Sequence, residues 1–132
     1  MSQENVEIVR RGFAAFNEGD LETTASLFHA DAEWRPYLGQ LGGRVHRGRD
    51  AIVKMWSDIN EHLVGLEMEP REFIDCGEAV VVMVEAKGIG TSSGAAVDDR
   101  WAQLYSLEDG LVRSVEAFST RESALEAARR QE

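Results

Sequence analysis

The chain has 132 residues and carries 14 Lys and Arg against 24 Asp and Glu, a formal net charge of −10. This length predicts a single domain over residues 1–132 that can bury a hydrophobic core. The acidic balance argues against nucleic acid as a partner, because a phosphate backbone is bound by clustered Lys and Arg. The longest apolar run, residues 79–84, is too short to span a membrane, and the polar N-terminus does not resemble a signal peptide. We therefore expect a cytoplasmic protein without a membrane partner.

The cysteine and histidine content predicts neither a disulfide nor a metal site. Cys76 is the only cysteine, and the three histidines lack the His-x-His or Glu-x-x-His spacing of metal ligands. No phosphate-binding loop, dinucleotide fingerprint or Gly-x-Ser-x-Gly elbow occurs. No cofactor is expected.

The first half of the chain predicts helices. Apolar residues recur at steps of three and four over residues 2–16, and the polar residues 17–20 end that helix. A short second helix runs to residues 29–31, where it ends. A third helix opens near Asp50, and its apolar side consists of Ile52, Met55, Trp56, Ile59 and Leu63.

The remaining segments predict a sheet. A short extended piece covers residues 32–36, and a glycine-rich loop follows over residues 38–48. Four further strands are expected at residues 67–76, 79–89, 96–107 and 111–118. Asp109-Gly110 is a strong hairpin signal, and residues 119–122 resemble a capping box before a short closing helix.

Helices followed by a meander of antiparallel strands are typical of an α+β fold. We predict a cone-shaped, curved antiparallel sheet that is covered by the three N-terminal helices and followed by a short C-terminal helix. A cone has an interior, and an interior that side chains do not fill is a ligand pocket.

Several stretches carry a resemblance to a known family. They are FAAFNEGDL at residues 13–21, LFHADAEW at 27–34, GRDAI at 48–52, DGLV at 109–112 and ESALEA at 122–127. With these segments the chain resembles nuclear transport factor 2-like proteins, and within them the SnoaL-like, ketosteroid-isomerase-related branch. The resemblance implies a deep, mostly apolar pocket for a small hydrophobic molecule and a homodimer through the outer face of the sheet.

The activities of that branch can be compared with this sequence position by position. The functional positions of ketosteroid isomerases fall on Gly12, Pro36 and, near the last hairpin, Ala102. In limonene-type epoxide hydrolases the essential arginine matches Arg100, but the two aspartates fall on Ala102 and near Ala117. Side chains that carry no proton cannot act as general acids or bases, so neither mechanism is expected.

Four residues remain as candidates for a catalytic role. His46 lies in the loop expected at the pocket mouth, and its pKa is ordinarily near neutral. Asp31 follows the second helix, where local capping is the alternative role. Arg100 and Glu116 are expected to form an ion pair inside the cone, with Glu85 as a second possible partner of the arginine.

Alternation along residues 96–107 divides that strand into two faces. The alignment directs Arg100 and Ala102 inward, which leaves Trp101 and Tyr105 for the outer face and the dimer contact. The residues expected to line the pocket are Phe13, Trp34, Trp56 and Phe118, with core packing as the alternative for both tryptophans.

Two functions follow from these residues. The first is a cofactor-independent isomerase, cyclase, dehydratase or hydrolase that acts on a hydrophobic metabolite. The second is a non-catalytic protein that binds a ligand or a partner with the same fold. The retained charged residues favour the first, and the loss of the recognised catalytic positions favours the second.

Overall fold

The computed structural model describes residues 2–36 and 44–131. Its elements, in chain order, are α1 (Ser2–Asn17), α2 (Leu21–Ser26), β1 (Phe28–Arg35), β2 (His46–Arg47), α3 (Arg49–His62), β3 (Leu63–Asp75), β4 (Ala79–Gly90), β5 (Ala96–Glu108), β6 (Leu111–Phe118) and α4 (Arg121–Arg130). The predicted order of three helices, a strand-rich half and a closing helix is confirmed. Residues 38–43 of the loop predicted over 38–48 lie outside the described residues, and its described part contains the short strand β2 instead of loop alone.

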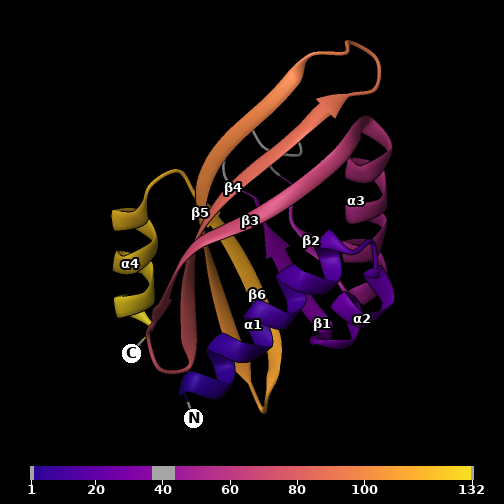
Figure 1. The fold of residues 1–132 in the computed structure, drawn as a ribbon. Helices are drawn as coiled ribbons and strands as arrows, with labels where there is room; N and C mark the ends of the chain where they lie inside the picture. Colours follow the sequence, from indigo (N-terminus) through magenta and orange to yellow (C-terminus); the bar gives the residue numbers. More distant parts are fainter. Residues whose placement is uncertain (1, 37–43, 132) are drawn as a thin grey trace.

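The strands form one curved, six-stranded sheet in the order β2-β1-β6-β5-β4-β3, which confirms the α+β class (Figure 1). All neighbouring pairs are antiparallel except β1 and β6, which run parallel, so the sheet is mixed. The register of β3 against β4 shifts at two places. Such irregularities bend and twist a strand, which suits a sheet that wraps around a core.

The second helix is shorter than its apolar spacing predicts. Asp20 caps it by accepting a hydrogen bond from the Thr23 backbone N–H at 3.1 Å, and the helix ends at Ser26. Phe28 already belongs to β1, where it pairs with Val112 of β6. Pairing with a strand far away in the sequence therefore overrides the local helical pattern, and Asp31 lies on a strand rather than after a helix.

The two faces of the sheet are covered by different helices (Figure 1). Helices α1, α2 and α3 cover the inner face, where the larger hydrophobic cluster lies. Helix α4 packs on the outer face over a smaller cluster that includes Val81, Ala102 and Leu104. Within the described part of the chain, no helix combines the length and the apolar character needed to cross a membrane.

The inner and outer faces of β5 are the reverse of those predicted. Ala102 is 0% exposed and packs beneath α4, whereas Trp101 and Tyr105 belong to the inner cluster. The alignment to the isomerases is therefore out of register by an odd number of residues on this strand, because such a displacement moves every side chain of a strand to the opposite face. Trp101 and Tyr105 do not supply the predicted dimer contact. A homodimer through the outer face of the sheet remains a prediction, with a contact formed by residues other than Trp101 and Tyr105.

Candidate functional site

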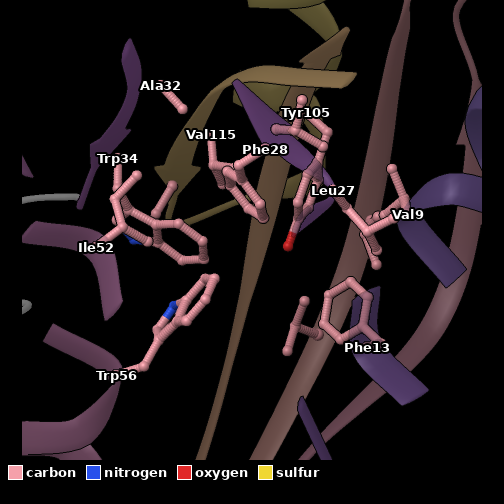
Figure 2. Packing of buried hydrophobic residues seen from close by; sticks show 14 of the residues in the cluster. Val9, Phe13, Leu27, Phe28, Ala32, Trp34, Ile52, Trp56, Tyr105 and Val115 are labelled. Carbon is pink, nitrogen blue, oxygen red and sulfur yellow. The ribbon is translucent and has the colours of Figure 1, made fainter. Parts of the chain in front are cut away.

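A cavity of about 220 Å³ lies between the inner face of the sheet and the three N-terminal helices. All three tryptophans of the chain, Trp34, Trp56 and Trp101, line it. Figure 2 shows Trp34, Trp56 and Phe28 on one side and Phe13 and Val9 on the other. The cavity wall is therefore largely aromatic and aliphatic.

Edge-to-face contacts hold this aromatic wall together. The ring of Trp56 lies 5.9 Å from Phe16, 5.5 Å from Phe28 and 5.9 Å from Trp34, measured between ring centroids. On the opposite side Phe13 contacts Tyr105 at 5.9 Å. Aromatic rings prefer these T-shaped arrangements, which fix their orientation as well as their separation.

Few polar groups reach the cavity. The Tyr105 hydroxyl donates a hydrogen bond to Gln103 Oε1 at 2.7 Å, and both residues are buried. Burial raises the pKa of Tyr105, so the hydroxyl keeps its proton and acts as the donor. The Thr24 hydroxyl donates to the backbone oxygen of Asp20 at 2.8 Å. The enclosed Nε1 of Trp101 has no partner among the residues that the structure describes.

Asp99 is the only charged side chain among the described residues that line the cavity. It is exposed and marks the rim, and its Oδ1 accepts a hydrogen bond from the Arg100 backbone N–H at 2.9 Å. A wall without Lys, Arg or His in its described part suits an uncharged molecule better than an anion.

Three of the four predicted pocket residues, Phe13, Trp34 and Trp56, line this cavity. Phe118 does not, because it packs with the outer cluster. The prediction for β6 missed a register shift between Ser106 and Leu107 of β5, which leaves Arg113 without an opposing residue on that strand. This extra residue puts Val112 and Phe118 on opposite faces.

The predicted catalytic residues do not meet in the cavity. Asp31 and Glu116 line a polar groove on the outer face. The predicted pairing of Arg100 with Glu116 inside the cone is wrong, since Leu104 is the residue of β5 that lies opposite Glu116. Arg100 is 76% exposed at its side chain and lies directly across from Glu85, which was the alternative partner.

His46 lies nearer the inner face than the other three candidates. It pairs with Trp34 across β1 and β2, and directly opposed residues of antiparallel strands point to the same face. Desolvation, and then the charge of Arg44, lower the pKa of His46, which favours the neutral imidazole at pH 7. Its Nε2 is enclosed and has no partner among the described residues, but His46 is not part of the described cavity lining.

On the outer face, an ion cluster surrounds a buried carboxylate. Glu85 is 1% exposed and accepts hydrogen bonds from Arg71 Nε at 2.9 Å and from Arg100 Nε at 3.0 Å. Lys87 Nζ lies 3.9 Å from the same carboxylate. The Arg71 hydrogen bond first, and then Arg100, lower the pKa of Glu85 from 4.5 to about 2.

This shift predicts how stability depends on pH. A carboxyl group whose pKa is lowered by folding contributes stability above its unfolded pKa and loses it as the pH falls through its folded pKa. The Glu85 contribution should therefore be complete above pH 4.5 and be lost toward pH 2. Between these values we expect the free energy of unfolding to fall less for Glu85→Gln than for the wild type, as measured by urea denaturation. An equal fall in the free energy of unfolding for Glu85→Gln and the wild type over this pH range would contradict the prediction. Glu61→Gln, at an exposed site, serves as the control.

No three His, Cys, Asp or Glu side chains within residues 2–36 and 44–131 lie close enough together to hold a metal ion. Sequence reasoning missed Asp99 and Gln103 as cavity residues, and it assigned Trp101 and Tyr105, which also line the cavity, to the outer face. The signal that could have found Gln103 is a polar residue inside the otherwise apolar run that begins at Trp101.

The SnoaL-like domain family matches residues 9–115, so the chain belongs to that family. A nuclear transport factor 2-like protein from Burkholderia xenovorans LB400 has the same fold, with 27% identity over 97% of this chain and 98% of that chain and a TM-score of 0.79. TerC, co-crystallised with polyporic acid, is 25% identical over 96% of this chain and 98% of that chain, with a TM-score of 0.77. A putative SnoaL-like polyketide cyclase from Jannaschia sp. CCS1 is 21% identical over 97% of this chain and 92% of that chain, with a TM-score of 0.79. No curated protein matches the chain.

Proposed function

We propose that the protein binds a small, flat, mostly apolar molecule in the inner cavity. The observation that carries this proposal is a volume of about 220 Å³ walled by three tryptophans and neighbouring aromatic rings. For scale, an apolar cavity of about 150 Å³ binds benzene. The volume therefore suits one or two fused rings. The structure of TerC, a similar protein that was co-crystallised with polyporic acid, supports this proposal.

The tryptophans give this proposal a direct test, because all three line the cavity. We expect tetralin, a neutral bicyclic hydrocarbon, to change the intrinsic tryptophan fluorescence in a saturable manner. Ala86 is buried and lines the cavity, so Ala86→Phe should fill part of the space and weaken binding at least tenfold. The same substitution at the exposed Ala96 of β5 is the matched control and should leave binding unchanged. Equal affinity in Ala86→Phe and wild type would contradict the proposed site.

A cofactor-independent enzyme that transfers protons is the second candidate, and one observation favours it. His46 shares its face with Trp34, and its lowered pKa leaves a neutral imidazole that can accept a proton. We expect such an enzyme to exchange the protons next to the carbonyl of 1-tetralone in D₂O, which proton NMR follows directly. Exchange that His46→Gln abolishes supports catalysis. Exchange no faster than in buffer leaves the protein a binding protein.

A further inference from the structure

We propose that the cavity takes a small hydrophobic amine, with its apolar body against the aromatic wall and its ammonium group paired with Asp99 at the rim. The inference rests on the proposed function and deepens it, because it names the chemical class of ligand that the same cavity takes. It gives Asp99 a binding role.

The first argument is the position of the carboxylate. Asp99 lies on β5 opposite Ala86 of β4, and both residues line the cavity. Asp99 is exposed, whereas Trp101, two positions or about 7 Å along the same face of the strand, is 8% exposed. Because Ala86 carries only a methyl group, the residue across from Asp99 does not cover the carboxylate. Asp99 therefore lies where the apolar interior meets water, and a charged group that binds it there keeps part of its hydration.

The second argument is that Asp99 has no counter-charge in the described part of the chain. Its Oδ1 accepts a hydrogen bond from the Arg100 backbone N–H at 2.9 Å, and no described Lys, Arg or His forms an ion pair with it. The side chain of Arg100 pairs instead with Glu85 on the outer face, at 2.8 Å, and Lys87 lies 3.9 Å from that same carboxylate. Asp99 therefore retains an oxygen for a positively charged ligand.

The third argument is the composition of the remaining wall. Within residues 2–36 and 44–131, the lining contains no Lys, Arg or His that would repel a cation. The electron-rich faces of aromatic rings attract a cation, and three tryptophans line this cavity. An anionic ligand would meet Asp99 at the rim without a compensating positive charge. The charged group that this rim favours is therefore a cation.

The kind of cation follows from what surrounds Asp99. A metal ion such as Ca²⁺ needs six or more oxygen ligands, and the described residues contain no group of three His, Cys, Asp or Glu that could hold one. An organic ammonium needs only one carboxylate, and its apolar part can fill the cavity of about 220 Å³ behind the rim. The class that fits is a cyclic or arylalkyl amine with its nitrogen at one end.

Calorimetric titration with matched ligands tests this proposal. 2-Aminotetralin, which is protonated at pH 7, and 2-methyltetralin have nearly the same shape and differ in charge. We expect the wild type to bind the amine about three- to tenfold more tightly, the gain from an exposed ion pair and an aromatic wall. Tetralin-2-carboxylate should bind more weakly than 2-methyltetralin.

Two variants of Asp99 show whether its charge makes this selection. Asp99→Asn removes the charge and keeps an oxygen that can accept the Arg100 N–H. It should reduce the preference for the amine to about twofold or less and leave 2-methyltetralin affinity within about twofold. Asp99→Lys should reverse the preference, so that tetralin-2-carboxylate binds more tightly than 2-aminotetralin. This second variant gains binding of a new ligand, which a protein that fails to fold does not.

Asp98→Asn is the matched control. It makes the same change in net charge at the adjacent residue, which lies opposite Lys87 and points to the outer face. It should keep the preference for the amine. An equal loss of preference in Asp98→Asn and Asp99→Asn would show that the overall charge of −10 attracts the amine, and would overturn the inference.

The remaining outcomes separate this inference from the proposed function. If none of the three ligands binds the wild type, the proposed function fails. If 2-methyltetralin binds at least as tightly as 2-aminotetralin, the cavity is a ligand site but the ligand is not an amine, and only the inference is overturned. A preference for the amine that persists in Asp99→Asn also overturns it.

Discussion

Replacing Trp56 by alanine is expected to lower the free energy of unfolding by about 3–5 kcal/mol. The side chain is 4% exposed, and its ring contacts Phe16 of α1 and Phe28 and Trp34 of β1. Trp56 itself lies on α3, so its loss loosens the packing of α3 against α1 and against β1 of the sheet. Urea denaturation followed by circular dichroism measures the change.

Lys54→Ala is the matched control for this substitution, because it lies on the same helix with its side chain 77% exposed. Its ion pair with Asp58, at 3.2 Å, is on the surface, so the expected change is about 0.5 kcal/mol or less. A similar small loss for Trp56→Ala would show that the aromatic cluster does not hold α3 in place. Trp56→Phe should fall between the two, since it retains an aromatic ring.

The sequence predicted best those elements whose signals are local. The third helix and the strands predicted at 79–89, 96–107 and 111–118 agree with the observed elements to within a residue or two. Helical periodicity, strand alternation and the Asp109-Gly110 turn each act within a few residues. Asp109 has a φ of 54° and Gly110 a φ of 78°, the left-handed backbone that this hairpin turn requires.

The assignment of faces failed where distant parts of the chain decide the outcome. Alternation separates the Arg100 side of β5 from the Trp101 side, but it does not say which side α4 covers. The extra residue of β6 and the parallel pairing of β1 with β6 likewise leave no clear local pattern. The four predicted catalytic residues are therefore absent from the described lining of the cavity. Gln103 and Tyr105, which lie on the face of β5 that the sequence analysis assigned to the outside, line it instead.

The corrected face of β5 predicts that Ala102→Asp is severely destabilising. Ala102 is 0% exposed between Met83 and Phe118 of the neighbouring strands, beneath α4. The alanines of α4, Ala124, Ala127 and Ala128, belong to the same cluster, so the helix lies close to the sheet. A carboxylate in this apolar layer has no counter-charge, and an uncompensated buried charge costs about 3–5 kcal/mol.

Ala96→Asp is the control for this charge, since it introduces the same side chain at an exposed position of the same strand and should change stability by about 0.5 kcal/mol or less. Burial should also raise the pKa of the carboxyl group that Ala102→Asp introduces, so the difference from wild type should narrow as the pH is lowered and the group becomes neutral. That narrowing separates a buried charge from a simple steric clash, which is independent of pH. If Ala102→Asp is instead as stable as Ala96→Asp, α4 does not cover this face of the sheet. That result would favour the sequence-based prediction that Arg100 and Ala102 point inward.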